Sequence, residues 1–110
     1  MDPAPSNIHK MYHVYLLKSQ KNDSFYVGYT NDLKRRLQEH NTGLVEYTKK
    51  FRPWSLIYYE TFTSLEDAKL REKSLKYFGK AFRQLKSRIK NSLNKCLNTK
   101  EGAGWKEFLL

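Results

Sequence analysis

With 110 residues and a mass of 13.1 kDa, the chain has the usual size of one domain and is too short for two. Hydrophobic residues make up 39% and aromatic residues 15%, which argues against disorder in the middle of the chain. The 21 Lys and Arg residues exceed the 11 Asp and Glu residues and give a formal charge of +10. This charge favours a polyanionic partner such as nucleic acid; the alternative is that it serves solubility.

The single cysteine, Cys96, cannot form an internal disulfide, and no Cys and His residues have the spacing of a zinc site. No apolar run approaches the roughly 20 residues of a membrane span. The polar start of the chain also lacks the apolar core of a signal peptide. We therefore expect a soluble, cytoplasmic protein with no membrane partner.

The first half of the chain predicts a flexible lead-in followed by a β-hairpin. Prolines in residues 1–10 argue against a strand or helix there. Residues 12–18 and 25–30 are rich in β-branched and aromatic side chains, and the turn-like segment 19–23 separates them. Two paired strands should follow.

A helix is expected after the hairpin, capped by Thr30 or Asn31, running to about Asn41 and ending near Gly43. A helix turns by about 100° per residue, which places four side chains on one buried face. They are Leu33, Leu37, His40 and Leu44. Arg36 accompanies this face, whereas Arg35 should point away.

Residues 56–62 predict a third strand, preceded by the basic connector 49–53. The segment Thr63–Glu66 has the form of a capping box, so a helix should follow to about Tyr77. The apolar stripe of this helix contains Leu65, Ala68 and Leu75.

Glu72 falls within that stripe, whereas Glu66 and Asp67 do not. A carboxylate on an inward face is destabilising by several kcal/mol unless it is paired, protonated or bound to a cation. Glu72 therefore needs a partner, and the simplest one is Lys69 or Lys76.

No acidic residue lies between Lys73 and Lys100, although the segment contains nine basic ones. Gly79 should separate two helices here, and four residues can form the packing stripe of the second helix. They are Ala81, Phe82, Leu85 and Ile89. The segment is either a track for nucleic acid or a solvated helical face.

The order of several residues now resembles a known nuclease family. VYL at residues 14–16 and YVG at residues 26–28 are followed by Arg36, His40 and Glu72. The patterns YVGYTNDLKRRLQEHNTG and AKLREKSLK are more specific than the two short motifs alone. The chain resembles the GIY-YIG nuclease superfamily, particularly small single-domain members similar to the nuclease module of the excision-repair endonuclease.

The resemblance implies an α/β fold in which a small central three-stranded antiparallel sheet is flanked by helices. It places the nuclease domain at residues 11–90, after the lead-in 1–10 and before a basic C-terminal extension at residues 91–110. The strands and helices predicted from the residues alone agree with this fold.

The resemblance also implies roles for individual residues. Tyr15 matches the tyrosine of the first motif, and Tyr26 and Gly28 match the second. Arg36 matches the catalytic arginine and Glu72 the metal-binding glutamate. His40 occupies a position where similar proteins carry a polar or aromatic catalytic assistant. The sequence departs from the pattern at Val14, where the name motif has Ile, at Tyr29, where some relatives have Lys, and at Gln84, where several have Asn.

Phosphodiester hydrolysis explains why these residue types are needed. We expect Glu72 to hold a single Mg²⁺ or Mn²⁺ and Arg36 to bind the scissile phosphate. Tyr15 or Tyr26 would orient or deprotonate water, and we favour Tyr15. Side chains of paired residues lie on the same face of a hairpin. Tyr15 and Tyr26 therefore face one site only if the two residue numbers in each cross-strand pair add up to an odd number.

The residues expected to contact nucleic acid extend this site along the chain. They are Gly28, Tyr29, Lys73, Lys76, Lys80 and Arg83. Gly28 would let the backbone bend or a phosphate approach closely.

We therefore expect a divalent-metal-dependent endonuclease that cuts DNA with low sequence specificity, in repair or recombination, as a monomer or weak dimer. Single-stranded, branched or damaged DNA are candidate substrates. One alternative is a nucleic-acid-binding module whose catalytic site is degenerate. A second alternative is an interaction domain of a larger assembly.

Overall fold

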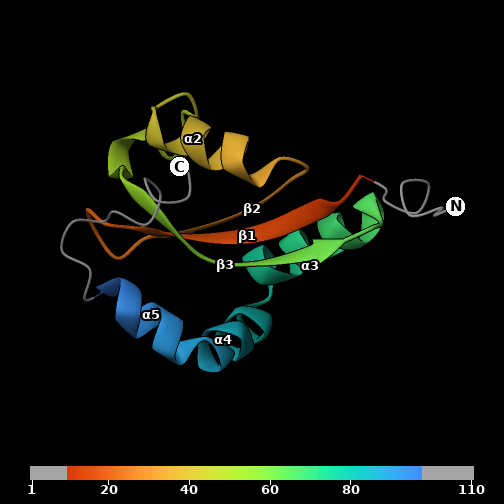
Figure 1. The fold of residues 1–110 in the computed structure, drawn as a ribbon. Coiled ribbons are helices and arrows are strands. Elements are labelled where there is room, and N and C mark those ends of the chain that lie inside the picture. The colour runs from red at the N-terminus through yellow and green to blue at the C-terminus, as the bar shows by residue number, and fades with distance from the viewer. Residues whose placement is uncertain (1–9, 98–110) are drawn as a thin grey trace, which may run out of the picture.

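The computed structural model describes residues 10–97 of the chain. Strands β1 (Tyr12–Ser19), β2 (Phe25–Thr30) and β3 (Trp54–Phe62) form an antiparallel sheet in the order β2-β1-β3 (Figure 1). Helix α2 (Leu33–Asn41) covers one face, and a short 3-10 helix, η1 (Lys49–Phe51), precedes β3. Helices α3 (Leu65–Tyr77), α4 (Gly79–Arg88) and α5 (Lys90–Leu97) lie on the other face. The expected α/β fold with a three-stranded antiparallel sheet is confirmed.

The predicted boundaries differ from the structure mainly at β3. This strand begins at Trp54 rather than Leu56, because Trp54 and Ser55 still pair with Ser19 and Lys18 of β1. The expected lead-in lies outside the described residues except for Lys10, and the expected extension lies outside them from residue 98 onward. Within the described residues, no helix is long and apolar enough to span a membrane.

The hairpin register places the two site tyrosines on one face of the sheet. Tyr15 lies opposite Gly28, and Leu17 lies opposite Tyr26, so paired residue numbers sum to an odd value as the shared site requires. Side chains alternate between faces along a strand. Tyr15 and Tyr26 consequently both face the α2 side of the sheet.

Each face of the sheet has its own apolar core. The core on the α2 side contains Tyr15, Leu17, Leu33, Leu37 and Trp54. The core beneath α3 and α4 contains Val14, Leu16, Val27, Ala68, Leu75 and Leu85. Consecutive residues of β1 thus anchor opposite layers, which makes β1 the central element of the fold.

The ends of α2 lie at other residues than the sequence pattern indicated. Asp32 is the N-cap instead of Thr30 or Asn31, and its carboxylate accepts from the Arg35 N–H at 3.1 Å. At the other end Gly43 has φ of 85°, and the Leu44 N–H donates to the Glu39 carbonyl at 3.0 Å. Leu44 is therefore past the helix and 76% exposed, so its predicted place on the buried face is wrong.

Helix α3 begins with Ser64 as N-cap, one residue later than the expected capping box, because its hydroxyl accepts from the Asp67 N–H at 3.3 Å. Gly79 separates α3 from α4 as predicted. Leu85 is buried, and Phe82 packs against the same core. The break that starts α5 at Lys90 was not predicted.

Asn41, the last residue of α2, joins this helix to the beginning of β3. Its side-chain amide donates to the Trp54 carbonyl at 3.0 Å, and its oxygen accepts from the Trp54 N–H at 2.6 Å. The Trp54 indole N–H donates to the Thr48 carbonyl at 2.9 Å. These bonds fix α2 and the loop after it relative to the sheet.

We predict that Asn41→Ala lowers the free energy of unfolding by about 2 kcal/mol, because it leaves two backbone groups of buried Trp54 without partners. Urea denaturation would measure the change. Gln38→Ala, on the exposed side of the same helix, should stay within about 0.5 kcal/mol of wild type. Equal losses in the two variants would contradict this role of Asn41.

Candidate active site

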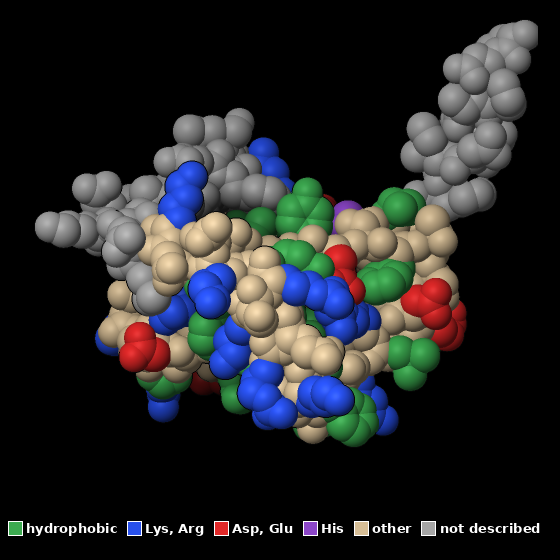
Figure 2. All heavy atoms as spheres, turned by 90° about the horizontal axis from the view of Figure 1, so that it is seen from below, with side chains coloured by type: hydrophobic (Ala, Val, Ile, Leu, Met, Phe, Trp, Pro, Cys, Tyr) green, Lys and Arg blue, Asp and Glu red, His purple; other side chains and the backbone are tan. Residues whose placement is uncertain are grey.

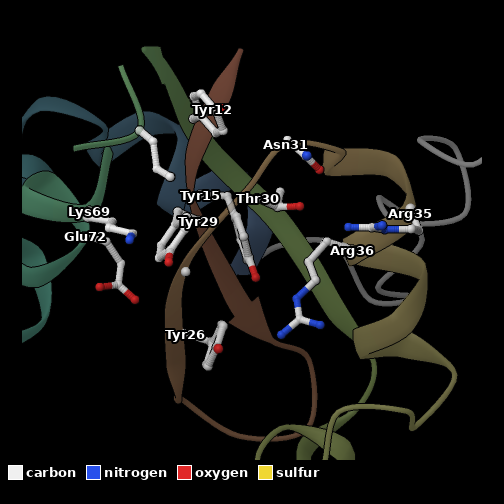
Figure 3. Close-up of a pocket in the computed structure, with 12 residues that line it drawn as sticks. Tyr12, Tyr15, Tyr26, Tyr29, Thr30, Asn31, Arg35, Arg36, Lys69 and Glu72 are labelled. Atoms are coloured by element: carbon white, nitrogen blue, oxygen red, sulfur yellow. The ribbon is translucent and has the colours of Figure 1, made fainter. Parts of the chain in front are cut away.

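A pocket of about 540 Å³ lies where residues of β1, β2, α2 and α3 meet (Figure 3). Six residues predicted from the sequence line it: Tyr15, Tyr26, Gly28, Tyr29, Arg36 and Glu72. Figure 3 shows Arg36 on one side of the pocket and Glu72 on the other, with the tyrosines between them. The remaining predicted catalytic residue, His40, lies behind Tyr15 and does not line the pocket.

The ring of Tyr15 passes directly over Gly28, which explains why this position is a glycine. A Cβ atom at residue 28 would lie 2.5 Å from the Tyr15 hydroxyl oxygen and 2.7 Å from Cζ. Real Cβ atoms essentially never approach a heavy atom so closely. The close approach that requires glycine here is that of the Tyr15 phenol.

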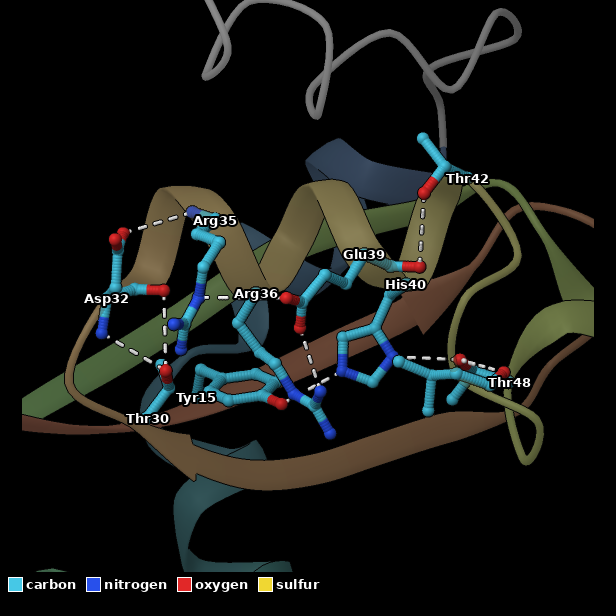
Figure 4. A network of polar contacts seen from close by, with 10 residues as sticks. Tyr15, Thr30, Asp32, Arg35, Arg36, Glu39, His40, Thr42 and Thr48 are labelled. Carbon is cyan, nitrogen blue, oxygen red and sulfur yellow. Dashed lines mark hydrogen bonds and ion pairs between the residues drawn. The ribbon is translucent and has the colours of Figure 1, made fainter.

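His40 connects Tyr15 to the loop after α2 by a chain of hydrogen bonds (Figure 4). The Thr48 hydroxyl donates to the Val45 carbonyl at 3.4 Å, so its oxygen accepts from the Nδ1–H of His40 at 2.8 Å. This assigns the lone pair of the imidazole to Nε2, which accepts from the Tyr15 hydroxyl at 2.9 Å. His40 is therefore a hydrogen-bond acceptor for Tyr15.

Burial keeps both members of this pair neutral. Burial and the nearby Arg36 charge lower the pKa of His40 from 6.5 to about 4, although the Glu39 carboxylate opposes the shift. Burial, with the neighbouring Tyr26, also raises the pKa of Tyr15 well above its ordinary value of 10.0. At neutral pH the phenol holds its proton beside an unprotonated imidazole.

Arg36 points into the pocket from α2, with its side chain 33% exposed. Its Nη1 donates to Glu39 Oε1 at 2.9 Å. Burial alone would lower the pKa of Arg36, but the hydrogen bond with Glu39 and the proximity of Tyr15 raise it above its ordinary value. Arg35, expected to point away, is 56% exposed at its side chain but also lines the pocket rim.

Glu72 has the partner that its inward position required. Its side chain is 18% exposed, and Oε2 lies 2.7 Å from Lys76 Nζ one helical turn later. Burial would lower the pKa of Lys76, but the bond to Glu72 raises it. Lys76 Nζ also lies 5.5 Å from the centre of the Tyr26 ring.

Glu72 fits a divalent cation of the Mg²⁺ type. Among the described residues, no group of three or more His, Cys, Asp or Glu side chains gathers to form a protein cage. Mg²⁺ and ions like it retain several waters and bind through one or two carboxylates together with substrate phosphate. A single carboxylate directed into an open pocket suits that mode of binding.

The remaining residues predicted to contact nucleic acid lie on α3 and α4. Lys73, Lys80 and Arg83 are exposed on these helices, outside the pocket. Figure 2, which views the molecule from below, shows Lys and Arg side chains across this face. The sequence suggested Lys69 only as a partner of Glu72, whereas Lys69 lines the pocket, and it gave no sign of Thr48 behind His40.

One known protein family matches much of this chain. The model of the GIY-YIG catalytic domain matches residues 11–77. The chain belongs to the GIY-YIG family. Tyr15, Tyr26 and Gly28, which the resemblance matches to the two motifs, lie within this range.

Several relatives carry the name UPF0213 protein, which states no function. One from Staphylococcus haemolyticus is 40% identical over 70 residues, which cover 63% of this chain and 84% of the relative. YazA of Bacillus subtilis is 40% identical over 75 residues, covering 67% of this chain and 73% of the relative. The solution structure of a UPF0213 protein from Bacillus halodurans has a TM-score of 0.50 at 29% identity, and it covers 81% of this chain and 98% of that one.

We predict that Gly28→Ala in this GIY-YIG domain displaces the Tyr15 ring and lowers any nuclease activity of the protein by roughly 100-fold, since small misplacements at a reacting centre have effects of that order. Initial cleavage rates would measure it. Gly79→Ala is the control, because its Cβ would meet only the flexible end of Arg83, at 3.2 Å. Unchanged activity of Gly28→Ala would disprove the positioning role of this glycine.

We also predict that acid destabilises the GIY-YIG domain through His40. Its folded pKa of about 4 is below the ordinary 6.5, so the unfolded state binds more protons between these values. Stability should be full above about pH 6.5 and fall by roughly 3 kcal/mol as pH drops toward 4. Urea denaturation across this range should show the fall in wild type and in His13→Gln, but not in His40→Gln. If the free energy of unfolding of His40→Gln still falls over this pH range, groups other than His40 cause the loss of stability.

Proposed function

We propose that the chain is a divalent-metal-dependent endonuclease that hydrolyses phosphodiester bonds in DNA with little sequence specificity. The proposal rests on one observation, the convergence of the Tyr15 hydroxyl, the Arg36 guanidinium and the Glu72 carboxylate on one pocket. A water activator, a phosphate clamp and a cation ligand are the groups that phosphodiester hydrolysis needs. Its biological setting would be repair or recombination.

The proton of the attacking water would leave through Tyr15. Because the Tyr15 hydroxyl donates to His40 Nε2 at 2.9 Å, its oxygen can accept a hydrogen bond from a water in the pocket. As the water proton moves to the Tyr15 oxygen, the phenolic proton moves to Nε2. Tyr15 thus ends the step neutral, which avoids a free phenolate that burial disfavours.

Arg36 would bind the scissile phosphate and also tune His40. Guanidinium forms charge-assisted, bidentate hydrogen bonds to phosphate oxygens, which strengthen as negative charge accumulates. In the absence of phosphate the Arg36 charge lowers the pKa of His40. Bound phosphate would neutralise that charge and make His40 a better proton acceptor only when substrate is present.

Glu72 would hold the divalent ion, with water and phosphate oxygens as its other ligands. When bound, this ion supplies charge stabilisation to the phosphate oxygens and to the departing oxygen. Lys76, which pairs with Glu72 at 2.7 Å, can move aside to an exposed position. The basic side chains of α4 would contact the DNA backbone beyond the pocket.

We predict that the purified protein cuts DNA with Mg²⁺ or Mn²⁺ and not with a chelator. Single-stranded, duplex and branched oligonucleotides would be tested by gel assay. Glu72→Gln and Arg36→Ala should each lower the rate by roughly 10²- to 10³-fold. Arg36→Lys should also be impaired, because lysine lacks the planar fork.

Matched controls lie on the same helices. Glu66→Gln and Lys34→Ala remove the same charges from exposed positions of α3 and α2 and should cut like wild type. Equal rates for Glu72→Gln and wild type would eliminate the proposed site. Metal-independent binding without any cutting would support the nucleic-acid-binding module instead.

A further inference from the structure

A second hollow, of about 560 Å³, adjoins the catalytic pocket and shares Tyr26 with it. Its lining includes Phe25, Tyr26, Tyr47, Tyr77, Phe82 and Lys76, and we call these six residues the aromatic groove. A third hollow, of about 490 Å³, shares Phe25 and Tyr47 with the groove. The hollows therefore follow one another along β2, which is one of the two edge strands of the sheet.

Two rings of the aromatic groove are far more exposed than the packing of the protein requires. Tyr47 is 80% exposed and Tyr77 is 71% exposed. The centre of the Tyr47 ring lies 6.0 Å from the centre of the Tyr26 ring. Phe25 and Phe82, by contrast, pack edge to face at 5.5 Å and form the base of the groove. The groove therefore offers free aromatic faces above a packed floor.

Cations stand among these rings. Lys76 Nζ lies 5.5 Å from the Tyr26 ring, and Lys86 Nζ lies 4.8 Å from the Phe82 ring. The described residues that line the groove include Lys76 and no carboxylate. Exposed aromatic rings with interleaved lysines form the chemistry that binds single-stranded nucleic acid, where rings stack on bases and cations contact phosphates.

We propose that the aromatic groove binds an unpaired nucleotide adjacent to the phosphate held in the catalytic pocket. The substrate class is then nucleic acid that is single-stranded on that side of the cut. In a duplex each base is already paired and stacked on both faces, so its ring cannot enter a groove of this kind. This inference rests on the proposed nuclease function for the position of the scissile phosphate.

The test is equilibrium binding by fluorescence anisotropy, in the presence of a chelator that prevents cutting. The probes are a labelled single-stranded DNA oligonucleotide and a blunt duplex of the same sequence. Tyr47→Ala and Tyr77→Ala should each weaken single-strand binding roughly tenfold and change duplex binding by less than about twofold, since stacking on one base has an effect of this order.

Two further variants distinguish stacking from general damage. Tyr47→Phe retains the ring and should bind like wild type. Tyr59→Ala removes a tyrosine that is 50% exposed on β3 and contacts His13 rather than the groove, so it should also bind like wild type. All of these positions are exposed, and circular dichroism would confirm that the variants fold.

Unchanged single-strand binding in Tyr47→Ala and Tyr77→Ala would overturn the proposal, as would equal losses on both probes. Cutting assays with Mg²⁺ keep this result separate from the proposed function. If the protein cuts DNA only with metal but Tyr47→Ala binds single-stranded DNA like wild type, the proposed nuclease function stands and the proposal for the groove fails. If the tyrosine variants lose single-strand binding selectively but the wild-type protein never cuts, the proposal for the groove stands and the proposed nuclease function fails.

Discussion

The hydrogen bond between Tyr15 and His40 is the constraint around which the site is built. Both side chains are buried in the layer between the sheet and α2, where an unpaired polar group would be strongly destabilising. Gly28 leaves room for the phenol, and Thr48 satisfies the far nitrogen of the imidazole. Asn41 then holds the end of the helix against β3. Each of these residues supports the contact between Tyr15 and His40. A substitution that alters the packing between the sheet and α2 therefore also alters the site.

The charged groups of the site are each balanced by a neighbour on their own helix. Arg36 pairs with Glu39, three residues later, and Glu72 pairs with Lys76, four residues later. Such partly exposed pairs add little stability, because water screens them and the side chains lose freedom. Phosphate can therefore replace Glu39 beside Arg36, and a cation can replace Lys76 beside Glu72, with little loss of folding stability. The folded protein keeps both charges in place while leaving them available to a ligand.

The sequence allowed the site to be predicted where periodicity governs side-chain direction. Helical spacing distinguished Glu72 from the exposed Glu66 and Asp67, and it placed Arg36 inward, although Arg35 also reaches the pocket rim. It could not reveal Thr48, which lies in a loop and reaches His40 only through the tertiary fold. It also placed Leu44 on a helix that had already ended, because the left-handed residue before it interrupts the pattern. Tyr47 escaped notice for a related reason, since the groove gathers rings from separate elements that no local pattern connects.

The position of the strands gives the two walls of the pocket different mobility. β1, which carries Tyr15, has a hydrogen-bonded neighbour on each side, whereas β2, which carries Tyr26 and Tyr29, has only β1 within the sheet. Edge segments open locally at a lower free energy than central ones, and their amides exchange sooner with solvent. The β2 side of the pocket can therefore open locally while Tyr15, on the central strand β1, stays fixed. Under the proposed function, a small domain of this design would admit nucleic-acid chains of different shapes while the Tyr15 hydroxyl keeps its position.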